Sequence, residues 1–243
     1  MNTRRKFLLQ GSMATTALLV AKPFTTVANS LAPVTGYSIN SNKLVLVHTG
    51  NHSTANNEDT LLHISNLRKT TGNLMVLHAG VASANHANPF KYDASIQPGE
   101  PFSVTEGDYK IIYKGDIKTG IINASASENI SAEKIDALAT YLKKEKNCQL
   151  VVCLSQLGYK TKNNLDDLRL AAASSHLDII IGGHAENFCK QPLTVLNRNR
   201  EEVIINHAAG NKLALRKIEI DFDEKGKKRQ IAFTRSIPRS KNA

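Results

Sequence analysis

The pattern of hydrophobic positions in the first third of the chain predicts a strand, a helix and a second strand. Residues 43–48 (KLVLVH) are a continuous apolar run, as expected of a strand buried on both faces of a parallel sheet. Residues 57–71 place apolar side chains on roughly one helical face, with acidic residues first and basic residues last. Residues 73–80 are again a buried strand. This order is typical of an α/β fold.

The second half of the chain returns to the same order after a hairpin. Residues 108–123 predict two strands around Lys114-Gly115-Asp116, and 131–146 predict a helix with Ser131 as its N-cap. A strand (149–155), a helix (164–175) and a strand (177–183) follow. The last strands are expected over 201–208, 213–222 and 229–235. The final two alternate polar and apolar residues, so we expect them to be antiparallel with one solvated face.

The stretch 81–107 between the two halves has no clear period and is rich in proline and glycine. A structureless loop of this length is uncommon inside a compact domain. We therefore expect it to be either functional or the remnant of lost sequence.

The N-terminal segment contributes a large part of the positive net charge. The 243 residues carry a formal net charge of +10, which falls to +6 without Arg4, Arg5, Lys6 and Lys22. Residues 1–29 combine a twin-arginine motif with a short apolar stretch and small residues, which indicates a twin-arginine export signal. The alternative is a basic N-terminal helix of a cytosolic protein. Because no clear A-x-A cleavage site is present, an uncleaved signal that tethers the protein to the membrane also stays open.

These features divide the chain into a signal (1–29), a polar linker (30–42), one α/β domain (43–236) and a loose tail (237–243). Export implies a periplasmic location and the twin-arginine translocase as a transient partner. The basic C-terminal stretch could contact phosphate or anionic lipid, but it lacks the interleaved aromatic residues of a stacking platform. No nucleic-acid partner is therefore expected.

Three cysteines are too few for a disulfide framework. Cys148 and Cys153 lie an odd number of residues apart in or beside one strand, so their side chains should point to opposite faces. We expect these two and Cys189 to be free thiols.

Four stretches resemble the calcineurin-like metallophosphoesterase superfamily, and most closely its bacterial 5'-nucleotidase-type metallophosphatases. They are DYKIIYKGDIKTGIIN, ATYLKKEKNCQLVVCLSQLGY, DIIIGGHAENF and EEVIINHAAG, and their order and spacing also match. The resemblance covers residues 108–224. It implies an α-β-β-α sandwich of mixed sheets, truncated in its first half, and a reaction in which two divalent metals hydrolyse phosphoesters.

The first two metal motifs of this family are degenerate here. In the first, VHTGNHS places Asn51 where the family has a ligand Asp and Ser53 where it has a ligand His; with a one-residue deletion, His52 could serve instead. In the second, HAGV places Val81 where the Asp that bridges both metals should be. A valine cannot bind a metal, so the bridge is lost.

The remaining motifs keep one clear ligand. The GNHE motif, which supplies the catalytic His, is absent, so no catalytic residue can be assigned. LSQLG places Gln156 at a ligand His, and GHAE keeps His184 but places Glu186 at the second ligand position. Asn51 and Gln156 are poor ligands, and we expect their amides to pair with each other or with the backbone.

Two functions follow from this pattern. The first is an exported member of the family that has lost the two-metal site and serves as a binding or accessory protein, without a cofactor and with a phosphorylated small molecule as its possible ligand. The alternative is a phosphoester hydrolase with a remodelled site, in which His52, His78, His184 and Glu186 converge on one divalent metal such as zinc or manganese.

Overall fold

The computed structural model describes residues 42–50, 57–80, 91–96, 104–105, 108–125, 130–162, 164–184, 189–208 and 215–236. All of them belong to the second of two compact units, residues 37–243, and we describe this unit by itself. The predicted signal, the tail and most of the predicted linker lie outside the described residues. No helix among the described residues is long and apolar enough to cross a membrane.

The first sheet joins the start of the unit to its end. Its five strands are ordered β11-β10-β1-β2-β3. The strands β1, β2 and β3 are parallel, whereas β10 is antiparallel to both β1 and β11. Their bounds are β1 Lys43–Thr49, β2 Leu74–His78, β3 Ala94–Ser95, β10 Leu215–Phe222 and β11 Lys228–Ser236, and helix α2 (Asn57–Thr70) connects β1 to β2.

The second sheet contains six strands in the order β4-β5-β6-β7-β9-β8. Four of them are parallel, and the edge strands β4 and β8 are antiparallel to their neighbours. The bounds are β4 Tyr109–Lys114, β5 Ile117–Ala124, β6 Leu150–Ser155, β7 Ile179–Gly182, β8 Leu193–Leu196 and β9 Glu202–His207, with α3 (Ala132–Lys144) before β6 and α4 (Asp167–Ala173) before β7.

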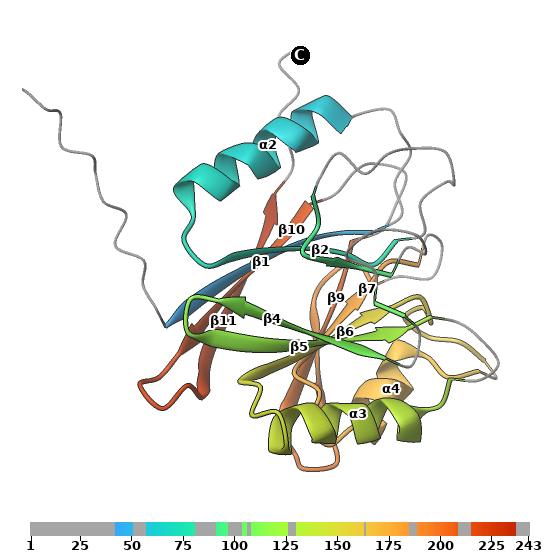
Figure 1. The fold of residues 1–243 in the computed structure, drawn as a ribbon. Coiled ribbons are helices and arrows are strands. Elements are labelled where there is room, and N and C mark those ends of the chain that lie inside the picture. The colour runs from blue at the N-terminus through green and yellow to red at the C-terminus, as the bar shows by residue number, and fades with distance from the viewer. Residues whose placement is uncertain are drawn as a thin grey trace, which may run out of the picture. The chain divides into compact units, whose positions relative to one another are not determined.

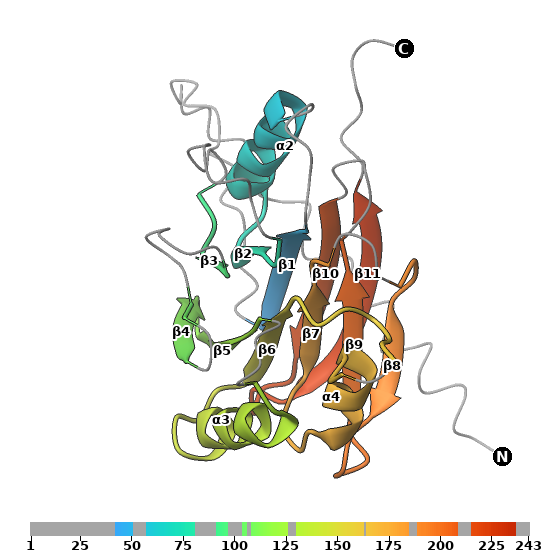
Figure 2. The ribbon, with the colours of Figure 1, turned by 90° about the vertical axis from the view of Figure 1, so that its right-hand side faces the viewer.

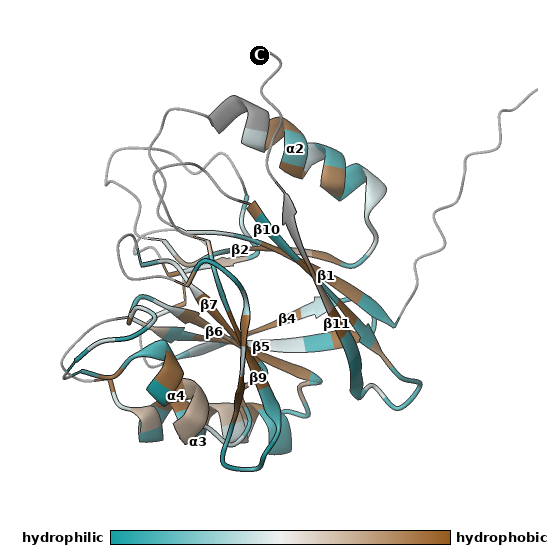
Figure 3. Ribbon diagram, turned by 180° about the vertical axis from the view of Figure 1, so that it is seen from behind, coloured by the Kyte–Doolittle hydropathy of each residue, from teal (hydrophilic) through white to brown (hydrophobic). Residues whose placement is uncertain are grey.

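Three hydrophobic clusters hold four layers together. The largest lies between the sheets, where Leu46 of β1 and Ile220 of β10 pack against Leu154 of β6. A second cluster joins the other face of the six-stranded sheet to α3 and α4, and a third joins β1 and β2 to α2. Figures 1 and 2 show α2 on one side of the strands and α3 with α4 on the other. Figure 3 shows hydrophobic residues concentrated along the strands. The layers are those of the expected α-β-β-α sandwich.

Most of the predicted elements are confirmed, and the exceptions have local causes. Ser131 caps α3 as predicted, by accepting a hydrogen bond from the Lys134 backbone N–H. The helix predicted from 164 begins only at Asp167, because the Asp166 carboxylate caps it. The two strands that the sequence missed, β3 and β8, are too short to show a period. The interpretation of 81–107 as wholly structureless is therefore wrong at Ala94–Ser95.

The cysteines are free, as expected, and the structure shows that all three are buried. Their predicted geometry is wrong in one respect. Cys148 and Cys153 pack into the same hydrophobic cluster rather than on opposite faces. The alternation rule does not apply to this pair, because Cys148 lies before β6 begins at Leu150.

Candidate functional site

The carboxyl ends of parallel strands from both sheets meet in the interior. Gly50 follows β1 and lies against Ala208, which follows β9, so closely that a Cβ atom on Gly50 would overlap the Ala208 carbonyl oxygen. Gly183, after β7, lies in the same way against the backbone of Ala79, after β2. Only glycine permits such close backbone contact. These contacts define the strand-end region, where an α/β fold commonly places its site.

Gln156 connects the two sheets at this region. It follows β6, is 9% exposed, and donates a hydrogen bond from its side-chain amide to the carbonyl oxygen of Ala79. The resemblance places a metal-binding His at this position in the family. Here the side chain ties the end of β6 to the end of β2 instead. The prediction that the Gln156 amide pairs with the backbone is confirmed.

His48 is a fully buried polar group of the strand-end region. It shares a face of β1 with Leu44 and Leu46, which point into the core between the sheets, and it is 0% exposed. Neither ring nitrogen has a hydrogen-bond partner among the described residues. Burial, assisted by the charges of Arg216 and His207, lowers the pKa of His48 to about 3. The ring is therefore neutral at physiological pH.

Arg216 brings a fixed positive charge to the same region. It pairs with His48 across the β1–β10 ladder and alternates in phase with the inward-facing Ile218 and Ile220. The half-buried guanidinium donates a hydrogen bond of 2.9 Å to the Lys190 carbonyl oxygen. The sequence analysis did not identify Arg216. A basic residue at an inward position of an alternating strand was the available signal.

His78 lies on the other face of the first sheet. Its Nδ1 is 2.7 Å from Thr49 Oγ1, and its ring stacks on Tyr92 with 4.7 Å between centroids and an interplanar angle of 10°. Tyr92 and Val76 belong to the cluster beneath α2. His48 and His78 therefore serve different layers, although both lie at strand ends.

A buried polar network that the sequence did not reveal lies between the six-stranded sheet and α4. The Asp167 carboxylate accepts a hydrogen bond of 2.5 Å from Ser155 Oγ, and its other oxygen is 2.9 Å from His207 Nε2. The Cys189 backbone N–H donates to His207 Nδ1, so Nδ1 carries no proton and the ring proton is on Nε2, toward Asp167. The serine hydroxyl faces the carboxylate rather than the imidazole. This is not the order of an activated nucleophile, and we interpret the network as structural.

The predicted metal ligands are only partly described. His184 lies two residues after the end of β7 and is half-buried. Five other predicted positions lie outside the described residues: Asn51, His52, Ser53, Val81 and Glu186. Among the described residues, no three His, Cys, Asp or Glu side chains are grouped closely enough to hold a metal ion. The convergence of His52, His78, His184 and Glu186 stays a prediction.

The described residues of the strand-end region do not fit a pair of divalent cations. Two such ions need anionic ligands to offset their charge and their lost hydration. The described side chains here include a neutral imidazole (His48), a guanidinium (Arg216), an amide already bonded to backbone (Gln156) and the half-buried His184, and none of these four is anionic. This set favours a bound anion.

Comparison with known proteins supports the fold. No protein-family model matches the chain, and neither does any curated protein sequence. One similar solved structure is the NAD nucleotidase of Haemophilus influenzae, with a TM-score of 0.63 and 14% sequence identity, in a match that covers 79% of this chain and 55% of that chain. Another is a 5'-nucleotidase precursor from Thermus thermophilus, with a TM-score of 0.55 and 18% identity, in a match that covers 79% of this chain and 54% of that chain. This chain thus spans about half the length of each. It has the 5'-nucleotidase type of metallophosphoesterase fold.

Proposed function

We propose that this protein binds a phosphorylated small molecule at the strand-end region without hydrolysing it, as a binding or accessory member of the 5'-nucleotidase type. The observation that carries the proposal is the position of Arg216 beside the neutral His48. A guanidinium attracts a phosphate group and forms strong charge-assisted hydrogen bonds with it. The same charge repels the metal ions that phosphoester hydrolysis in this fold would use.

The sequence supports the loss of hydrolysis independently. Asn51 and Val81 stand where the resemblance requires carboxylates, and Val81 takes the place of the bridging Asp. A metal pair without a bridging carboxylate lacks the ligand that holds its two ions together. The described position of Gln156 adds to this argument, because its amide is already bonded to Ala79.

Assays of turnover and of binding test the proposal together. The full chain is incubated with 5'-AMP, 4-nitrophenyl phosphate and bis(4-nitrophenyl) phosphate in the presence of Mn²⁺, Zn²⁺ or Mg²⁺, and no turnover is expected. Calorimetric titration with 5'-AMP should show binding that Arg216→Gln weakens about tenfold, because a charge-assisted contact is lost. Arg229→Gln, at an exposed position of β11, is the matched control and should bind like the wild type. Turnover that His184→Ala abolishes would overturn the proposal.

The alternative function, a hydrolase with one remodelled metal, is favoured by the position of His184 in the strand-end region, two residues after β7 ends. Elemental analysis of the purified protein distinguishes the two functions. Zinc or manganese at one atom per chain, lost in His184→Ala, would favour the hydrolase. Protein without stoichiometric metal would count against it.

Export is part of the proposal and rests on the twin-arginine motif of residues 1–29. We expect the protein in the periplasmic fraction, either free or tethered by an uncleaved signal. Replacement of both Arg4 and Arg5 by lysine should retain the protein in the cytoplasm, because the translocase recognises the arginine pair. Unchanged fractionation of this variant would contradict export by this route.

A further inference from the structure

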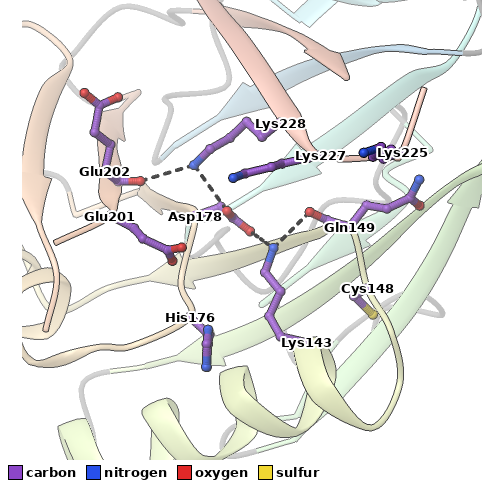
Figure 4. A pocket seen from close by; sticks show the side chains of 11 residues that line it. Lys143, Cys148, Gln149, His176, Asp178, Glu201, Glu202, Lys225, Lys227 and Lys228 are labelled. Atoms are coloured by element: carbon purple, nitrogen blue, oxygen red, sulfur yellow. Dashed lines mark hydrogen bonds and ion pairs between the residues drawn. The ribbon is translucent and has the colours of Figure 1, made fainter. Parts of the chain in front are cut away.

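A cavity of about 490 Å³ opens at the end of the six-stranded sheet opposite to the strand-end region. Its walls come from the last turn of α3, the segments that lead into β6 and β7, the start of β9 and the turn between β10 and β11 (Figure 4). The amino ends of the parallel strands lie here. The volume is in the range of pockets that hold small molecules.

Two lysines are fixed in this cavity by one buried carboxylate. Asp178 is 8% exposed, and one of its oxygens accepts hydrogen bonds of 2.7 Å from the Val151 backbone N–H and 2.7 Å from Lys143 Nζ. Its other oxygen is 3.2 Å from Lys228 Nζ. Figure 4 shows both lysine side chains reaching Asp178 from different elements. The carboxylate thus holds two ammonium groups in place before any ligand arrives.

Each of these ammonium groups keeps one donor for a ligand. Lys143 Nζ also donates to the Gln149 carbonyl oxygen at 2.9 Å, and Lys228 Nζ donates to the Glu202 carbonyl oxygen at 3.2 Å. An ammonium group has three N–H donors, so one remains on each lysine. Both side chains are 22% exposed and line the cavity.

The local charge selects an anion. Lys143 and Lys228 together outweigh Asp178 by one positive charge, and the exposed Lys227 points toward the same carboxylate in Figure 4. Lysine ammonium groups bind phosphate as point charges. Glu201 and His176 also line the cavity and offer groups that accept hydrogen bonds from hydroxyls. The cavity therefore suits a molecule with a phosphate group at one end and hydroxyls at the other.

We propose that this cavity is a second ligand site, which binds a phosphorylated polyol or sugar through Lys143, Lys227 and Lys228. The phosphate accepts hydrogen bonds from the three ammonium groups, and the hydroxyls face Glu201 and His176. The site is separate from the strand-end region, so it does not depend on the function proposed above.

Calorimetric titration of the full chain tests this site with glucose 6-phosphate, inorganic phosphate and glucose as probes. Glucose 6-phosphate should bind more tightly than inorganic phosphate, and glucose should not bind. Lys227→Gln is the informative variant, because Lys227 is exposed and its removal leaves the Asp178 contacts intact. It should weaken glucose 6-phosphate binding about tenfold. The control is Lys144→Gln, which removes the same charge from an exposed position next to Lys143 in the last turn of α3. It should weaken the binding of glucose 6-phosphate less than about twofold.

The competing outcomes are distinct. Equal weakening by Lys227→Gln and Lys144→Gln would reveal a general charge effect and overturn the proposal, as would the absence of saturable binding. Weakening by Arg216→Gln with no effect of Lys227→Gln would place the sugar phosphate in the strand-end region and also overturn it. Weakening by Lys227→Gln with no effect of Arg216→Gln supports the second site, whatever the outcome for the proposed function.

Discussion

The change of Asp167 to asparagine tests whether the buried network holds the six-stranded sheet to α4. Asp167 is 0% exposed and meets Ser155 Oγ with one oxygen and His207 Nε2 with the other. Ser155 Oγ donates a hydrogen bond to the carboxylate, and the His207 ring faces it with the nitrogen that carries the ring proton. An asparagine side chain offers only one oxygen, so in either orientation its amide group leaves one donor of the network without an acceptor.

The cost of this change follows from the number of unpaired groups. One buried donor without a partner costs about 1–3 kcal/mol. Asp167→Asn should therefore lower the free energy of unfolding by about 1–3 kcal/mol. Asp167→Ala leaves both donors unpaired and should lower it by about twice as much. Both changes also remove a negative charge from the first turn of α4, which adds a smaller loss in each variant.

Urea denaturation followed by circular dichroism measures both variants against the wild type. Asp116→Asn is the matched control, because Asp116 is exposed in the turn between β4 and β5, and it should stay within about 0.5 kcal/mol of the wild type. If Asp167→Asn is as stable as this control, the two contacts carry no net energy and the interpretation of the network as structural is refuted.

Three further predictions concern other buried groups. His48→Leu should flatten the dependence of the free energy of unfolding on pH. Burial lowers the pKa of His48 in the folded protein from 6.5 to about 3. The contribution of the neutral ring to stability is therefore complete above pH 6.5, and below it falls by about 1.4 kcal/mol per pH unit as acid protonates this histidine in the unfolded chain. If the free energy of unfolding depends equally on pH in wild type and variant between about pH 6 and pH 4, the burial of a neutral ring is contradicted. Gly183→Ala should lower the unfolding free energy by about 1–3 kcal/mol, measured by urea denaturation, because a Cβ atom would overlap the Ala79 backbone; unchanged stability would refute that close contact. Thiol titration with a chromogenic disulfide should be slow in the folded protein and complete in urea, since burial raises the pKa of Cys153 well above its usual value; rapid labelling of the folded protein would contradict this.

Much of the fold could be predicted because its signals are local. Continuous apolar runs marked the parallel strands, and alternation marked β10 and β11 as antiparallel with one solvated face. The Ser131 cap fixed the start of α3. The signals failed where an element is too short to show a period, as at β3, and where a cap lies inside an apolar pattern, as at Asp166 before α4.

The candidate site could be predicted less well, since spatial convergence has no local signal. Six histidines lie at or near predicted strand ends, and the sequence treats His48 and His78 alike. The structure places the first in the core between the sheets and the second beneath α2, because each side chain follows the alternation of its own strand. Arg216 was overlooked because its importance depends on its neighbour across the ladder.

By itself, the sequence determined the order and type of most elements and the resemblance to the 5'-nucleotidase type of metallophosphoesterases, and it predicts the loss of the bridging carboxylate at Val81. Each of these depends on residues that are neighbours in the chain or on which side chain stands at a given position. Only the tertiary structure decided that Arg216 lies beside His48, that Asp167 joins Ser155 to His207, and that Asp178 holds Lys143 and Lys228 at one cavity. These groups come from distant parts of the chain, and the pairing of strands and the packing of layers bring them together.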